Sequence, residues 1–169
     1  MTAQNKEEFE KRIDAKAVPE NAVEAIQPFL KEAKRIRWYH EYDGDKESFE
    51  CKFKKFGYWF SVEFDKEGLL EDVEIKIKYH TLPHDIKEKI SGYFIKEYDR
   101  WKIEKVQQQF TSLESLKSKP NPLLKSFLEI IVATKQDGSI KKYEYLFDAE
   151  GNVITKRKVI RQSHDFLLF

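Results

Sequence analysis

The sequence predicts an α+β fold: a tandem repeat of one helix plus a four-stranded antiparallel meander, with the helices on one face of a curved antiparallel sheet. The first reason is a recurring segment, since residues 58–68 and 141–151 both alternate apolar with polar side chains and both end in Phe-Asp, one variable residue and Glu-Gly. The second is that Val18-Pro19 and Leu82-Pro83 each open a stretch with apolar residues at helical spacing. An internal repeat of this kind predicts two related units.

The predicted boundaries follow from this repeat. We place an N-terminal segment at residues 1–17, the first repeat at 18–81, the second at 82–160 and an apolar tail at 161–169, all in one continuous structural domain. The N-terminal segment stays open, because Phe9 and Ile13 fit one helical turn and residues 8–13 fit an edge strand equally well. The tail is expected to need a surface to lie on.

The first repeat begins with a helix that carries Ala22 and Ile26 on its apolar stripe. Pro28 predicts a kink or an end near Gln27, because proline costs about 3 kcal/mol inside a helix. From residue 35 the period changes to two, which predicts a half-buried strand. Three further strands follow, and Phe64 is expected to close the packed face of the last hairpin.

The second repeat begins with a helix that carries Ile86, Ile90 and Phe94 on its packed face. Strands are predicted at residues 127–134, 140–147 and 153–160, and Phe147 takes the place of Phe64. In both repeats the Asp-x-Glu-Gly turn requires a glycine with positive φ.

The insertion at residues 107–125 is rich in glutamine, serine and proline, so we predict no strand in it. Two interpretations are open: a recognition loop that projects Phe110, Leu113 and Leu116, or a tolerated, partly packed loop. The second is favoured and predicts a poorly ordered backbone at residues 118–121. If instead the leucines belong to the core, shortening the loop would destabilise the protein.

Composition restricts the classes of function. The chain has 31 Lys and Arg against 30 Asp and Glu, a net charge of +1, so no global field attracts nucleic acid. No apolar run approaches the roughly 20 residues of a membrane span. The single cysteine, Cys51, lies between two strand phenylalanines and is expected to be a buried, inert thiol.

Several segments resemble a known family. They are the Leu/Val-Pro helix starts, residues 34–38 at the opening of the sheet, residues 53–58 at the central hairpin and the Phe-Asp-x-Glu-Gly turns. Together they are similar to β-lactamase-inhibitor-like, PepSY-like proteins exported by Bacteroidetes, over residues 18–160. The resemblance implies helices on one side of an antiparallel sheet, no catalytic residues and export. The protein is then expected in the periplasm or outside the cell if a signal peptide was removed, and in the cytoplasm if Met1 is the native start.

We find no catalytic site, metal site or cofactor site to propose from the sequence. His80 and His84 have the spacing of zinc ligands on a helix, but Pro83 prevents one helix from carrying both. Asp65, Glu67, Asp148 and Glu150 could suggest calcium or acid-base chemistry. Their repetition at two equivalent positions is better explained by turn formation.

One surface remains once the core is assigned. Because Trp38 and Phe60 face the helices, Tyr39 and Trp59 should emerge on the opposite sheet face beside Arg37. Tyrosine, tryptophan and arginine are frequent anchors of protein interfaces, so we predict a partner-binding surface formed by Arg37, Tyr39, Trp59, Phe110 and Leu113. Cross-strand packing that shields the sheet is the alternative.

These observations favour a non-catalytic, exported binding or inhibitor-type module. Its partner is expected to be a protein of the cell envelope, and the chain itself a monomer or weak homodimer. Two alternatives remain: a structural or homo-oligomeric protein without an external ligand, and a small-ligand carrier.

Overall fold

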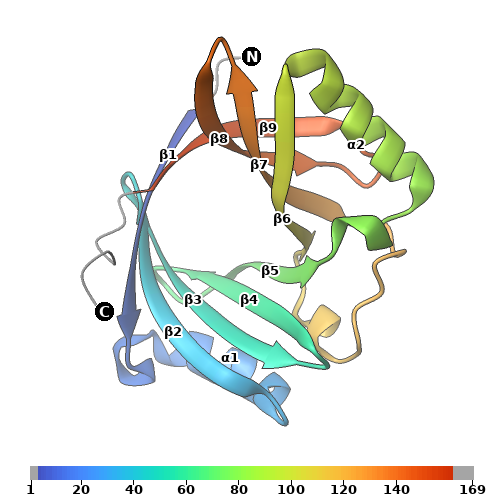
Figure 1. Cartoon of the computed structure of the whole chain (residues 1–169). Coiled ribbons are helices and arrows are strands. Elements are labelled where there is room, and N and C mark those ends of the chain that lie inside the picture. Colours follow the sequence, from blue (N-terminus) through green and yellow to red (C-terminus); the bar gives the residue numbers. More distant parts are fainter. Residues whose placement is uncertain (1–3, 162–169) are drawn as a thin grey trace.

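Nine β-strands follow one another in chain order around a single closed sheet in the computed structural model, which describes residues 4–161, with side chains for residues 9–160 (Figure 1). Each strand pairs antiparallel with the next, and β1 closes the sheet by pairing in parallel with β9. The strands are β1 (Gln4–Ile13), β2 (Lys34–Asp43), β3 (Lys46–Lys55), β4 (Tyr58–Asp65), β5 (Leu70–Ile77), β6 (Arg100–Phe110), β7 (Phe127–Gln136), β8 (Ser139–Phe147) and β9 (Val153–Arg161).

The described part of the chain holds two α-helices, α1 (Glu20–Ile26) and α2 (His84–Glu97), and both lie outside the ring of strands (Figure 1). Each starts directly after a proline, where the missing amide hydrogen costs no helical hydrogen bond. A 3₁₀ helix at Gln27–Leu30 follows α1 around Pro28, which confirms the predicted end near Gln27. No helix among the described residues is long and apolar enough to cross a membrane.

The two Asp-x-Glu-Gly turns are alike in their hydrogen bonds. The Asp65 carboxylate accepts from the Glu67 and Leu69 amides at 3.0 and 2.8 Å, and the Asp148 carboxylate accepts from the Glu150 and Asn152 amides at the same distances. Gly68 and Gly151 have φ angles of +79° and +81°, as predicted for both turns. The repeated sequence therefore specifies a local turn.

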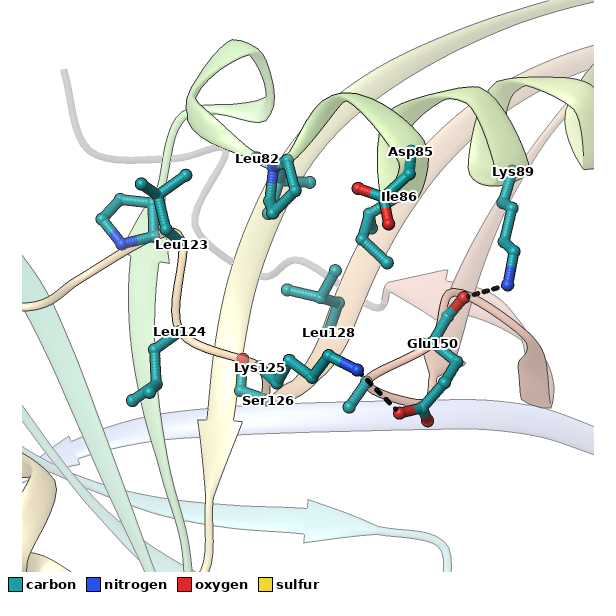
Figure 2. A pocket seen from close by; sticks show the side chains of 13 residues that line it. Leu82, Asp85, Ile86, Lys89, Leu123, Leu124, Lys125, Ser126, Leu128 and Glu150 are labelled. Carbon is teal, nitrogen blue, oxygen red and sulfur yellow. Dashed lines mark hydrogen bonds and ion pairs between the residues drawn. The ribbon is translucent and has the colours of Figure 1, made fainter.

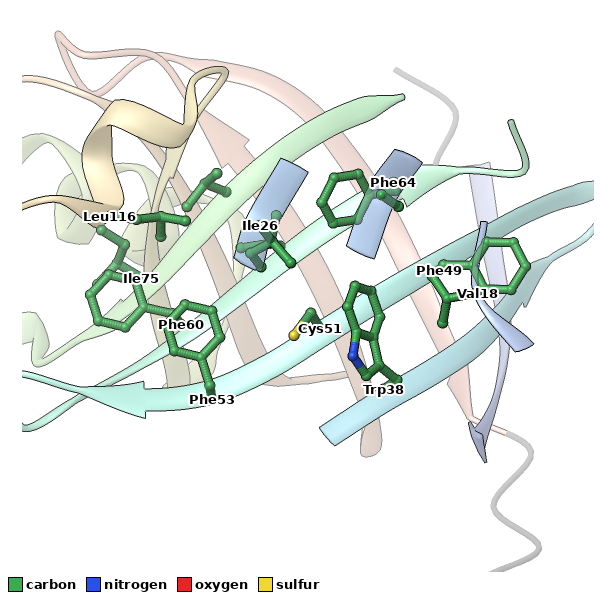
Figure 3. Close-up of a cluster of buried hydrophobic side chains, with 13 residues drawn as sticks. Val18, Ile26, Trp38, Phe49, Cys51, Phe53, Phe60, Phe64, Ile75 and Leu116 are labelled. Carbon is green, nitrogen blue, oxygen red and sulfur yellow. The ribbon is translucent and has the colours of Figure 1, made fainter. Parts of the chain in front are cut away.

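Two apolar clusters hold the helices to the outer face of the sheet. The first joins α1 to β2–β5 and contains Trp38, Cys51 and Phe64 (Figure 3). The second joins α2 to β6–β8 through Phe94 and Phe147. Both Phe64 and Phe147 are completely buried, which confirms that each closes the packed face beside its turn. Cys51 is completely buried too, as predicted, and burial, with the nearby Glu50 charge, raises its pKa to about 12.

The predicted tandem repeat of helix plus four-stranded meander is wrong. The strands of both predicted repeats form one closed sheet, because β5 pairs with β6 and the sheet continues without a break, and residues 4–161 are mostly β with two short α-helices. The N-terminal segment, for which the sequence leaves helix and an edge strand at residues 8–13 both open, forms β1 over Gln4–Ile13, which pairs with β2 and β9. A recurring turn specifies a hairpin, whereas closure depends on backbone pairing of a charged strand whose sequence shows no clear apolar alternation.

The prediction that residues 107–125 hold no strand is also wrong in part, since β6 continues to Phe110. Gln107 and Gln108 are buried within it, because their amides find acceptors. The Gln107 side chain donates to Glu74, and Gln108 Nε2 donates to the Asn121 and Leu124 carbonyl oxygens at 3.1 Å each.

The rest of the insertion is partly packed. A 3₁₀ helix at Leu113–Leu116 places Leu116 completely inside the first apolar cluster, while Leu123 and Leu124 are exposed. A poorly ordered backbone at residues 118–121 stays a prediction. Of the predicted tail at 161–169, Arg161 ends β9 and the remaining residues lie outside the described part.

Candidate functional site

The inner face of the closed sheet is polar, in contrast to the outer face that packs on the helices. Strand alternation sends Trp38, Cys51 and Phe60 outward, so their neighbours along each strand point inward. Bases stand at one end of the inner face and acids at the other, from Arg37 to Glu41 on β2 and from Lys54 to Glu50 on β3. The same order holds from Lys76 to Asp72 on β5, whereas on β4 Trp59 stands at the basic end and Glu63 at the acidic end.

Lys52 sits among three inner-face carboxylates. Its ammonium lies 2.7 Å from Glu50, 3.0 Å from Glu10 and 3.8 Å from Glu41. Burial opposes its charge, but these carboxylates outweigh that effect and raise the pKa of Lys52. Burial likewise opposes the charge of Glu50, and hydrogen bonding with Glu41 and the Lys52 charge reverse this and lower its pKa.

The oxygens of Glu10, Glu41 and Glu50 lie within 4.8 Å of one another, which is close enough for three metal ligands. Lys52 already supplies a positive charge to this group. The arrangement therefore serves to join β1, β2 and β3 by charge, and it provides no independent sign of a metal.

A second polar cluster spans β5, β6 and β7. Gln109 Nε2 donates to the Asp72 carboxylate at 3.1 Å, and Gln107 donates to Glu74. Burial, with the Glu63 and Glu129 charges, raises the pKa of Asp72 to about 7. Burial and Glu129 also raise the pKa of Glu74 well above its ordinary value. At neutral pH this cluster therefore holds protons on carboxylates that ordinary aspartate and glutamate would have released.

A third cluster links strands from the two ends of the chain. The Arg157 guanidinium on β9 donates to Glu144 on β8 at 3.1 Å and to Asp43 on β2 at 3.2 Å. Asp43 and Arg157 are 114 residues apart in the sequence. The pair therefore adds a side-chain contact across the region where the sheet closes.

The structure brings three of the five predicted binding residues onto this inner face. Arg37 is exposed, Tyr39 is half-buried with Lys52 Nζ 4.7 Å from its ring centre, and Trp59 is half-buried with the Arg35 guanidinium 6.0 Å from its ring centre. Phe110 and Leu113 lie elsewhere, since both pack against the first apolar cluster on the outer side of the sheet.

The predicted binding surface included Arg37 but not Lys54 and Arg35, two further cations beside Trp59. Lys54 pairs with Trp59 across β3 and β4, and alternation along the strands could have identified it. Arg35 could not be found in this way, because β2 has an extra residue between Lys34 and Arg37 that interrupts the alternation.

An apolar pocket of about 210 Å³ lies between the start of α2 and the insertion (Figure 2). Leu82, Ile86 and Leu128 form one side, and Leu123 and Leu124 approach from the insertion. Lys125 pairs with Glu150 at 3.5 Å beside it. Its volume is below the 300–1,000 Å³ typical of small-molecule sites, so it suits a single apolar side chain.

An open groove of about 710 Å³ runs along α2, where Glu88, Lys89 and Lys96 surround Tyr93. Its charged groups are of both signs, and it holds no cluster of groups that suggests chemistry.

The structure gives other roles to the residues that the sequence suggested as metal ligands. His84 is exposed and lies 3.6 Å from Glu88, and His80 lies in a 3₁₀ helix that precedes α2. Asp65 and Asp148 use their carboxylates to hold the turn backbones. Among the described residues, neither the histidines nor these turn carboxylates form a group with metal-ligand geometry.

Comparison with solved structures supports the fold. A DUF2874 family protein from Bacteroides ovatus matches with a TM-score of 0.57 and 17% identity, covering 90% of this chain and 94% of its own. A BLIP-like protein from Bacteroides fragilis matches with a TM-score of 0.53 and 18% identity, covering 89% and 92%. A Bacteroides eggerthii protein provisionally assigned to the periplasm matches with a TM-score of 0.58 and 15% identity, covering 89% and 94%.

These likenesses concern the fold alone, because the identities are low. They support the β-lactamase-inhibitor-like part of the sequence resemblance at that level, and none of the three is described as PepSY-like. No protein-family model matches the chain, and no curated protein matches it in sequence.

Proposed function

We propose that the protein is a non-catalytic module of the bacterial cell envelope that binds a protein partner through the inner face of its sheet at Arg37, Tyr39 and Trp59. One observation carries the proposal. Arg37 is exposed to solvent, and Tyr39 and Trp59 are partly exposed. The opposite face of the same strands packs into the apolar core. Aromatic and arginine side chains grouped in this way are the usual anchors of protein interfaces.

The fold neighbours support an envelope location and an inhibitor-type action. One neighbour is provisionally periplasmic and one is BLIP-like. The finer form of the proposal is that the partner is an enzyme whose activity falls when Trp59 and Tyr39 cover part of its surface. β-Lactamases are the first enzymes to assay for this effect.

Binding of a small ligand is less well supported. The pocket in Figure 2 is too small for most ligands, and its mouth is bordered by an ion pair between Lys125 and Glu150. Phe110 and Leu113 do not belong to the proposed surface, because both pack against the first apolar cluster.

Affinity capture from the native envelope fraction tests the proposal. The bait proteins are the unmodified chain, a Tyr39→Ala/Trp59→Ala variant, and an Ile95→Ala/Lys96→Glu control on the exposed side of α2. We expect the inner-face variant to lose a protein that the other two retain. Equal recovery by all three baits would refute the inner face as the binding surface.

A further inference from the structure

Positively charged side chains lie near Trp59 at one end of the inner face. Lys54 pairs with Trp59 on one side. On the other side Phe60 pairs with Ile75, which puts Lys76 at the level of Trp59 on β5. Arg35 lies over the ring at 6.0 Å, and Arg37 follows on the same strand. We call Arg35, Arg37, Lys54, Trp59 and Lys76 the cationic rim.

The charges of the rim are uncompensated. Within residues 9–160, Arg35, Arg37, Lys54 and Lys76 form no ion pair with an acidic side chain. Lys46 and Lys52 lie on β3 together with Lys54. Unlike Lys54, each of them forms an ion pair with glutamate side chains. Four unpaired cations at one end of the inner face repel one another, and this repulsion is relieved when an anionic group binds.

The backbone also departs from regular structure here. Arg35 has a φ of +57°, a left-handed conformation that non-glycine residues rarely adopt, and it lies in the bulge of β2. In this conformation the Arg35 guanidinium lies 6.0 Å from the centre of the Trp59 ring. Such backbone strain is concentrated at functional sites.

From these observations we infer that the cationic rim docks an acidic segment of a protein partner, with carboxylates beside Lys54, Lys76 and Arg37 and an apolar or aromatic side chain against Trp59. The inference rests on the proposed function and adds the chemistry of the partner. A protein segment fits better than a nucleic acid, because Glu50, Glu63 and Asp72 lie deeper on the same strands. A polyphosphate chain extended across the face would meet these acids.

Fluorescence anisotropy with defined probes tests the inference. The probes are a labelled peptide of alternating glutamate and phenylalanine, its lysine counterpart, and a single-stranded oligonucleotide, each measured at low and at physiological salt. We expect the glutamate peptide alone to bind, and its affinity to fall about tenfold or more between the two salt concentrations.

Charge-matched variants locate the site. Lys54→Glu/Lys76→Glu is expected to abolish peptide binding, and the milder Lys54→Gln/Lys76→Gln to weaken it about tenfold. Lys96→Glu/Lys119→Glu makes the same change in net charge at exposed positions of α2 and of the insertion and should leave binding unchanged. Equal losses in both charge-reversal pairs, no binding of the glutamate peptide, or tighter binding of the oligonucleotide would each overturn the inference.

The capture experiment separates this inference from the proposed function. If recovery of the envelope partner depends on Tyr39 and Trp59 but not on Lys54 and Lys76, the inner face binds a partner that is not acidic, and only the inference fails. If recovery depends on neither pair, the proposed function fails.

Discussion

Two phenylalanines anchor the two apolar clusters, Phe64 the first and Phe147 the second. Phe64 packs with its ring centre 6.1 Å from that of Trp38, and Phe147 lies 5.9 Å from both Phe94 and Tyr145. Replacing either with alanine should lower the free energy of unfolding by about 3 to 5 kcal/mol, because a large cavity remains in a close-packed core. Urea unfolding measures the change. Ile95→Ala, at an exposed position of α2, is the control and should change stability by less than about 0.5 kcal/mol.

Asp72 should make stability depend on pH. Its folded pKa of about 7 lies above the ordinary value of 3.8, so the folded protein holds a proton that the unfolded chain releases. Stability is therefore expected to fall as pH rises from about 4 to about 7, by on the order of a few kcal/mol.

The matched substitution is Asp72→Asn, which keeps an acceptor for Gln109. We expect it to raise stability at pH 8 more than at pH 5, as measured by urea unfolding at both values. Asp99→Asn, at an exposed position, serves as the control. A variant with the same pH profile as the unmodified protein would show that Asp72 is not the titrating group.

The insertion contributes one completely buried side chain, that of Leu116, to the core. Leu116→Ala should cost about 2 to 5 kcal/mol, because Leu116 is completely buried against the first cluster. Leu123→Ala, at a mostly exposed position, should cost little. Replacement of residues 111–126 by a two-residue turn is therefore expected to destabilise the protein, and an unchanged midpoint of thermal unfolding would contradict the packing.

The first strand is held by charge as well as by backbone pairing. Lys52→Met leaves Glu10, Glu41 and Glu50 close together without their cation, and should cost about 1 to 3 kcal/mol at pH 7. The loss should shrink at pH 4, where carboxylates take up protons. Lys46→Met, which removes a more exposed cation, should cost less than about 1 kcal/mol. A larger effect of Lys46→Met than of Lys52→Met in chemical unfolding would argue against this cluster.

For the molecule as a whole, the sequence predicted local structure, but it did not predict that the sheet closes. The Asp65 and Asp148 turns, the end of α1 and the burial of Phe64 depend on neighbouring residues, so periodicity and turn chemistry predicted them. The parallel pairing of β1 with β9 joins segments from opposite ends of the chain. No short-range pattern in a charged strand indicates such a partner.

The same distinction applies to the candidate site. Alternation placed Tyr39 and Trp59 on the face opposite Trp38. It could not show that Phe110 and Leu113 pack on the outer side, because the path of the insertion depends on buried hydrogen bonds from Gln108. Nor could it show that Arg35 approaches Trp59, since this depends on a bulge.

We propose that the inner face of the sheet, and not the side that carries the helices, meets the partner. Photo-crosslinking distinguishes the two surfaces: benzoylphenylalanine replaces Trp59 in one protein and the exposed Ile95 of α2 in another, and both are irradiated with the native envelope fraction. We expect a discrete adduct from position 59 and none from position 95. An adduct from position 95 without one from position 59 would contradict the proposal.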